Sequence, residues 1–233
     1  MTVAAVVLAA SPASALADAD GTPAVRRIAD AAWAGGATPV VVVAADTDGA
    51  VAASLATAEV TLLEPGPLDG GPAGQIAHGI AGAARLVGAT TAALVWPTRF
   101  AWADAETVTT LIAAHGELDP EAALVPVYGD AAGFPVLVPL SALPAIQALS
   151  PDQAPAEFAS DLATAGVPVV FVITGDPGAT HDLSVPRTAL PPFDGPPRPD
   201  DGVEREWGSP AADQPDDAPP AGPTRLANPD PAR

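Results

Sequence analysis

Apolar runs of strand length recur along the chain, separated by segments with helical spacing. The run that begins at Val3 is followed by a segment in which Val25, Ile28 and Ala32 recur at helical spacing. The next run, residues 39–45, is unbroken and rich in β-branched residues, which is typical of a strand buried on both faces of a parallel sheet. A strand, a helix and a parallel strand make one βαβ unit, so the pattern predicts an α/β fold.

The same alternation continues toward the C-terminus and then changes. We expect strands at 59–63, 91–96 and 167–173, and helices at 50–58, 73–86, 104–114, 140–149 and 155–165. Only the five residues GDAAG separate the apolar runs 122–128 and 134–139, which indicates a hairpin-like connection and not a helical crossover. The predicted fold is therefore α/β, with a mostly parallel central sheet, helices on both faces and a small antiparallel extension.

Apolar periodicity stops near Leu190, where Pro, Asp and Ala begin to dominate. We expect one domain over residues 1–189 and an acidic, proline-rich disordered tail over 190–233. A charged cluster around Trp207 interrupts the tail and is a candidate docking motif for a protein partner.

The strongly negative charge of the chain limits the classes of partner that it can bind. The formal net charge is -19, and the nine basic residues are all arginines that do not cluster, so we expect no nucleic-acid binding. There is no cysteine, which excludes disulfides and thiolate metal sites. No stretch approaches the roughly 18 apolar residues of a membrane helix. No positive charge precedes the apolar run at Val3, which disfavours a signal peptide, and we expect a cytoplasmic protein with no membrane contact.

Ligands of open parallel sheets lie beyond the carboxyl ends of the strands, so the loops at those ends carry the candidate chemistry. The first loop, expected over Ser11–Gly21, has no Arg or Lys to bind an anion. Arg99 follows the strand 91–96, and Asp176 and Asp182 follow the last strand, at the same expected edge. Carboxylates there could hold Mg²⁺ on nucleotide phosphates, although an Asp in such a loop more often caps a turn.

The three histidines, His78, His115 and His181, lie in unrelated contexts and show no metal-binding spacing. His78 falls within a helical run, where a structural role is more common than a catalytic one.

Several short motifs, none specific alone, together resemble the MobA-like NTP transferases, the molybdenum-cofactor nucleotidyltransferase group, over most of residues 3–190. Their order and spacing carry the resemblance: AAVVLAA at the start, Gly21-Thr22-Pro23, Gly35-Gly36 before VVVV, Gly79, Glu106-Thr107-Val108, Gly133-Phe134-Pro135 and the run from His181 to Pro186. The resemblance implies the nucleotide-diphospho-sugar transferase fold, with a nucleoside triphosphate as ligand or substrate and Mg²⁺ as a cofactor.

The resemblance also assigns positions in the site. It implies nucleotide binding by Leu8, Ala9, Ala10, Ser11, Gln75 and Gly79. Ser11 stands where the family has a glycine, and the family's phosphate-binding Arg and Lys are missing around Ala15, Leu16 and Ala19. Arg99 stands where the family has the aspartate that binds the catalytic metal, and Asp182 matches a second metal contact.

These departures leave three hypotheses. The first is a nucleotidyltransferase-family domain with lost or reduced transfer activity, acting as a nucleotide-binding or partner-interaction module. The second is an active nucleotidyltransferase with a rearranged site, in which Arg99 binds the triphosphate and Asp182 or Asp176 holds the metal. The acceptor would then be a small phosphorylated or cofactor-like molecule. The third is a structural protein that binds a partner through its tail.

Overall fold

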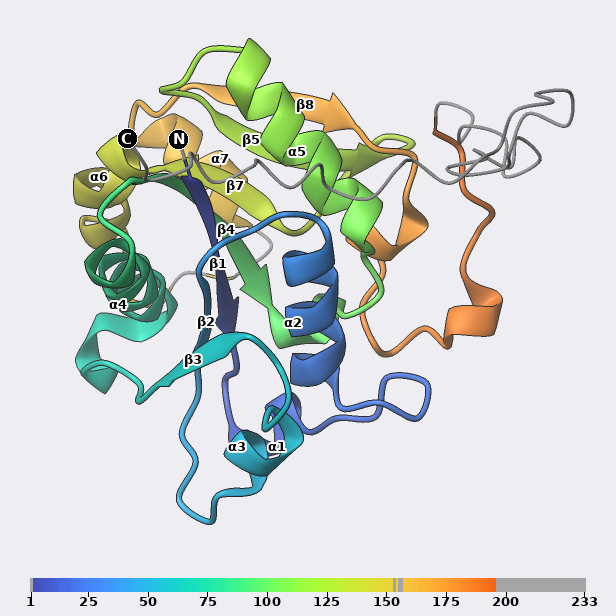
Figure 1. Ribbon diagram of the computed structural model, residues 1–233. Coiled ribbons are helices and arrows are strands. Elements are labelled where there is room, and N and C mark those ends of the chain that lie inside the picture. The colour runs from blue at the N-terminus through green and yellow to red at the C-terminus, as the bar shows by residue number, and fades with distance from the viewer. Residues whose placement is uncertain (1, 153, 155–156, 196–233) are drawn as a thin grey trace, which may run out of the picture. The chain divides into compact units, whose positions relative to one another are not determined.

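The computed structural model describes residues 2–152, 154 and 157–195, and Figure 1 shows how the elements follow one another. The described strands are β1 (Thr2–Leu8), β2 (Val40–Val43), β3 (Val60–Leu63), β4 (Thr90–Pro97), β5 (Ala123–Tyr128), β6 (Ala131–Ala132), β7 (Val136–Pro139) and β8 (Val169–Ile173). The described helices are α1 (Pro12–Ala15), α2 (Ala24–Ala34), α3 (Ala50–Ser54), α4 (Gly71–Leu86), α5 (Ala105–Glu117), α6 (Leu143–Gln147) and α7 (Phe158–Thr164). Short 3-10 turns at 68–70, 98–100, 140–142, 177–179 and 187–189 join some of them.

The sheet is mostly parallel, as the sequence predicts. Its strand order is β3-β2-β1-β4-β7-β5-β6, with β8 paired to the other side of β5. Strand β7 is antiparallel to both β4 and β5, and Leu137 is the register partner of Leu94 on one side and Leu124 on the other. The antiparallel part is thus a reversed strand in the middle of the sheet, reached through the hairpin after β5.

Helices cover both faces of the sheet. Figure 1 shows α2 and α5 on one face and α4 and α6 on the other. Strands β1 and β2 between these layers are almost wholly buried. Because both faces need apolar side chains, the runs in these strands do not alternate with polar residues.

One glycine lets α4 approach the sheet closely. A Cβ atom on Gly79 would lie 2.3 Å from Val6 Cγ1 and 3.0 Å from Val43 Cγ2, so only a glycine fits at this contact. The helix therefore packs directly on β1 and β2.

The expected loop at Ser11–Gly21 is wrong in its first turn, where α1 forms. Ser11 caps this turn: its hydroxyl accepts from the Ser14 backbone N–H, and the Ser14 hydroxyl accepts from the Ser11 N–H. Pro12 occupies the first helical position, where its missing N–H costs nothing. The hydrogen bonds between Ser11 and Ser14 thus stabilise a helical turn in a segment whose apolar pattern is too short to predict a helix.

Some predicted boundaries also shift. The segment expected as a helix over 50–58 is helical only at Ala50–Ser54, and the segment 140–149 divides into a 3-10 turn and α6. Helix α7 is described over Phe158–Thr164, inside the expected 155–165.

The start of the predicted tail lies against the domain. Leu190 packs on the core, and the Asp194 N–H donates to the Gly175 carbonyl. The rest of that segment, 196–233 with Trp207, lies outside the described residues, and the 189/190 boundary stays a prediction. Within the described chain, no helix is long and apolar enough to cross a membrane.

Candidate functional site

A cleft of about 490 Å³ opens beyond the carboxyl ends of β1, β2 and β4. Five of the residues that the sequence analysis assigns to the site line it: Leu8, Ala9, Ala10, Gln75 and Arg99. The other lining residues are Ser14, Val43, Ala45, Pro65, Leu68, Pro72, Ile76, Val95, Pro97, Thr98, Phe134 and Phe158. The cleft is therefore walled mainly by aliphatic, aromatic and proline side chains.

Arg99 and Asp182 come together at this edge of the sheet. Arg99 Nη2 donates to Asp182 Oδ2 over 2.9 Å, and the two residues are 83 positions apart. The Arg99 side chain is 54% exposed and that of Asp182 is 26% exposed. Both the cation and the carboxylate thus remain accessible from solvent.

The turn that carries Arg99 is held in place by backbone contacts. The Trp96 indole N–H donates to the Phe100 carbonyl, and the Leu183 N–H donates to the Arg99 carbonyl, each over 2.9 Å. The Trp102 indole N–H donates to the Val185 carbonyl. The segment 182–185 is thus fastened alongside the 98–102 turn, which fixes the backbones that carry the ion pair.

Asp182 is also held by its own loop. Its Oδ1 accepts hydrogen bonds from both the hydroxyl and the backbone N–H of Ser184. These bonds, chiefly the one from the hydroxyl, and the nearby Arg99 lower the pKa of Asp182, while its partial burial opposes them. The carboxylate is therefore ionised at neutral pH and oriented toward Arg99.

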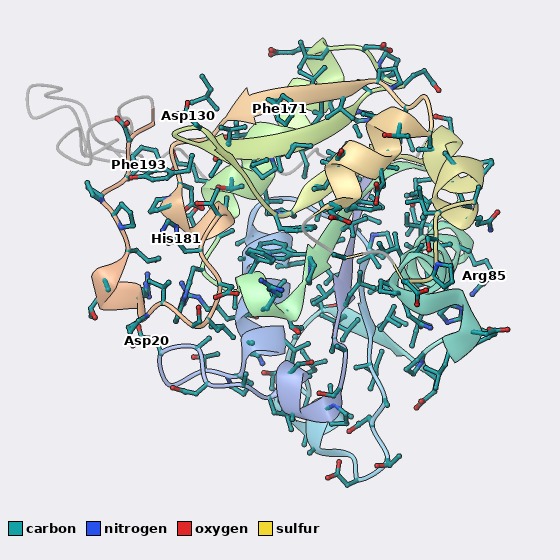
Figure 2. All side chains as sticks on the ribbon, turned by 180° about the vertical axis from the view of Figure 1, so that it is seen from behind. Asp20, Arg85, Asp130, Phe171, His181 and Phe193 are labelled. Carbon is teal, nitrogen blue, oxygen red and sulfur yellow. The ribbon has the colours of Figure 1, made fainter. Side chains whose placement is uncertain are left out.

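Arg99 is the only charged residue that lines the cleft among those the structure describes. Arg26 pairs with Asp30, and Arg27 donates to the Ala101 carbonyl and lies over Trp102. Arg187 lies 3.4 Å from Asp20, which Figure 2 shows beside the 187–189 turn, and Arg85 is labelled at the far end of α4. The other described arginines are therefore engaged or placed away from the cleft.

The residues present do not fit a divalent metal at the implied position. The Arg99 guanidinium already pairs with Asp182 there, so a dication at that carboxylate would have to compete with Arg99, in a repulsion that solvent screens because the Arg99 side chain is 54% exposed. The described residues also contain no group of three His, Cys, Asp or Glu side chains that could hold a metal.

Three assigned residues have identifiable structural contacts. Gln75 uses its whole side-chain amide on the backbone of the loop before it: Oε1 accepts from the Gly66 N–H, and Nε2 donates to the Gly66 and Pro67 carbonyls. Ser11 caps α1 and is not a lining residue, although Ser14 is. Gly79 packs on Val6 and does not line the cleft. Their assignment to nucleotide binding stays a prediction.

Asp176 is buried, with 6% of its surface exposed, and it accepts three hydrogen bonds. Its donors are the Asp104 N–H, the Thr107 hydroxyl and the Gly178 N–H. Burial raises its pKa, and the hydrogen bond from Thr107 opposes that shift. These contacts hold the loop after β8 against the start of α5. They support a structural role for Asp176, one of the two roles that the sequence left open.

The histidines have separate surroundings. His78 Nε2 contacts the Glu64 carbonyl at 3.0 Å, and His181 Nδ1 contacts the Pro177 carbonyl at 2.8 Å. His115 is buried in α5, burial lowers its pKa, and its Nδ1 has no hydrogen-bond partner among the described residues. None of the three lines the cleft.

Sequence reasoning missed the walls of the cleft that come from distant segments. Phe158 belongs to α7, and Leu68 belongs to the turn before α4. Phe134 stands in the Gly-Phe-Pro motif, which was a usable signal, and its ring packs 4.9 Å from that of Phe100. The pattern of a single element does not reveal which side chains meet across a cleft.

Comparisons with known proteins agree with this architecture. A nucleotidyl transferase from Methanothermobacter superposes with a TM-score of 0.63 at 16% identity, covering 78% of this chain and 91% of that one. A Mycobacterium tuberculosis protein, Rv0371c, in complex with manganese superposes with a TM-score of 0.57 at 19% identity, covering 76% of this chain and 92% of that one. A 4-diphosphocytidyl-2C-methyl-D-erythritol synthase superposes with a TM-score of 0.58 at 16% identity, covering 81% of this chain and 94% of that one.

No curated protein sequence matches the chain. The family model of the MobA-like NTP transferase domain matches residues 5–167, which is most of the described domain and includes all but the first three residues of β1, the Arg99 turn and the cleft walls up to Phe158. The chain therefore belongs to the MobA-like NTP transferase domain family.

Proposed function

We propose that this chain is a member of its family that has lost metal-dependent nucleotidyl transfer, or retains little of it, and that it uses the cleft as a metal-independent binding site. The observation that carries the proposal is the ion pair between Arg99 and Asp182. Asp182 is the implied metal ligand, and the Arg99 guanidinium already pairs with it.

The first loop supports the same proposal. Phosphoryl transfer depends on positive charges that neutralise the developing charge on the phosphates, usually a metal ion with a Lys or Arg. The segment 8–21 contains no basic residue, and Ser11, Pro12 and Ser14 there build the short helix α1. The charge clamp of a transferase would thus rest on Arg99 alone.

An active transferase is the second candidate, because a relative of this fold was solved with manganese and an arginine can bind phosphate directly. In that case Asp182 or Asp176 would hold the ion. The hydrogen bonds of Asp176 to Thr107, Asp104 and Gly178 weigh against it, because a metal there would have to displace them.

A thermal-shift screen with ATP, GTP and CTP separates the candidates, each nucleotide being tested in EDTA, in Mg²⁺ and in Mn²⁺. A ligand at about 100 times its Kd adds about 2.7 kcal/mol to stability, which is about 5–10 °C in Tm for a domain of this size. We expect that no shift depends on metal. Stabilisation by a nucleotide that requires Mg²⁺ or Mn²⁺ would overturn the proposal.

A further inference from the structure

The lining of the cleft points to a class of ligand. Resting on the proposed metal-independent binding site, we infer that the cleft binds a small apolar molecule carrying one carboxylate, with the carboxylate against Arg99 and the body among the apolar side chains.

The body of the ligand is defined by the walls. Val43, Ile76 and Val95 line the cleft with the rings of Phe134 and Phe158. The volume of about 490 Å³ lies within the range of roughly 300–1,000 Å³ that is usual for small-molecule sites. These five side chains are nearly buried and form the floor of the cleft, whereas the apolar surface that remains open to water lies on Leu8, Ala9, Pro65, Leu68 and Pro72. An aliphatic or aromatic body of that size would replace water there.

The polar part of the walls is small. Ser14, Thr98 and Gln75 line the cleft, but the amide of Gln75 is already bound to the backbone at Gly66 and Pro67. Leu68 is 84% exposed at the same cleft, an apolar side chain that the body of a ligand would cover.

The single carboxylate follows from Arg99. Its guanidinium lies over the Phe100 ring, 4.9 Å from the centroid, and donates to Asp182 through Nη2. A guanidinium carries several N–H donors in a planar fork that matches a carboxylate. Arg99 can therefore donate to a second carboxylate while Asp182 stays in place.

A triphosphate fits these charges less well. It carries several negative charges, whereas the described lining offers one cation, and Asp182 lies beside that cation. Asp182 would also repel the additional phosphate charges. The expected order of affinity in the absence of metal is thus an apolar monocarboxylate above a nucleoside triphosphate.

Calorimetric titration of the full chain in EDTA tests this order with 2-naphthoate, its uncharged counterpart 2-naphthamide, CTP and GTP. We expect 2-naphthoate to bind about 10-fold tighter than 2-naphthamide and tighter than either nucleotide. Tighter binding of CTP or GTP in EDTA would overturn the inference and leave the proposed function standing, whereas nucleotide binding that requires Mg²⁺ or Mn²⁺ would overturn the proposed function. Absence of any 2-naphthoate binding would overturn the inference alone.

Two pairs of variants locate the bound probe. Arg99→Leu should weaken 2-naphthoate by about 10-fold and leave 2-naphthamide unchanged, while Arg187→Leu, which also breaks an arginine–aspartate pair, should change neither. Ala45→Trp fills the cleft and should abolish both, while Ala53→Trp, exposed on α3, should not. Equal effects of Arg99→Leu and Arg187→Leu would overturn the inference. Unfolding curves of the free variants show whether each one is folded.

Discussion

The Arg99 Nη2 atom lies 2.9 Å from the Asp182 Oδ2 atom, so the two positions at which the family resemblance implies metal ligands are occupied by a cation and its counter-ion. The backbones that carry the pair are fastened together by the bonds between Leu183 and Arg99 and between Trp102 and Val185. The proposed metal-independent site depends on this ion pair.

The ion pair should contribute little to stability, because both side chains are partly exposed. A double-mutant cycle with Arg99→Leu and Asp182→Asn, measured by urea unfolding, should give a coupling free energy of about 0.2–1 kcal/mol. A coupling of several kcal/mol would mean that the pair is a structural clamp and not a group available to a ligand.

Asp176→Ala should lower the free energy of unfolding by about 2–4 kcal/mol, since it removes the acceptor of three hydrogen bonds inside the fold. Affinity for a ligand of the cleft should stay unchanged, because Asp176 does not line it. Asp182→Ala serves as the comparison and should cost less. If Asp176→Ala kept wild-type stability but lost binding of Mn²⁺, Asp176 would be a metal ligand after all.

Gly79 and Gly74 of helix α4 offer a matched pair. Gly79→Ala should destabilise the protein by about 1–3 kcal/mol, because its Cβ would overlap Val6. Nothing lies within 4 Å of a Cβ on Gly74, so Gly74→Ala should stabilise the protein by about 0.5–1 kcal/mol through helix propensity. Chemical unfolding measures both. Similar effects at the two positions would argue against close packing of α4 on the sheet.

Stability should fall as the pH is lowered below about 6.5, in part because of His115. Burial lowers the pKa of His115, so the unfolded chain takes up a proton at a higher pH than the folded one. The contribution of His115 to the free energy of unfolding is fully present above the pKa that His115 has in the unfolded chain. It is lost as the pH falls toward the lower pKa of the folded protein, with a slope of at most about 1.4 kcal/mol per pH unit. His115→Leu should flatten that part of the profile, and an unchanged slope would contradict the assignment.

Much of the fold follows from local pattern, and much less of the site does. The run at 39–45 predicts a buried parallel strand because helices must cover both of its faces, and the five-residue connection at 129–133 predicts the antiparallel pairing. Arg99 and Asp182 could be placed at one edge of the sheet from the strands that precede them. Their hydrogen bond could not, because it depends on how two turns 83 residues apart are fastened together.

The walls of the cleft illustrate the same limit. Phe134 precedes β7 and Phe158 begins α7, and the apolar patterns of those elements are explained by the core alone. That both side chains also line the cleft is a property of the packed fold. Helix α1 was missed for the opposite reason. Its capping by Ser11 and Ser14 is local, but the helix is too short to show a periodic apolar pattern.

Binding of Mn²⁺, followed by the electron paramagnetic resonance signal of the free ion, shows whether Asp182 is available to a metal in this protein. In the wild type, any Mn²⁺ binding should be unaffected by Asp182→Asn, because Arg99 already neutralises that carboxylate. Arg99→Asp should create an Mn²⁺ site at least about 10-fold tighter than any site of the wild type, and adding Asp182→Asn should remove it again. Arg187→Asp, beside Asp20, should not create a site of that strength. A single Mn²⁺ site in the wild type that Asp182→Asn abolishes would contradict the account.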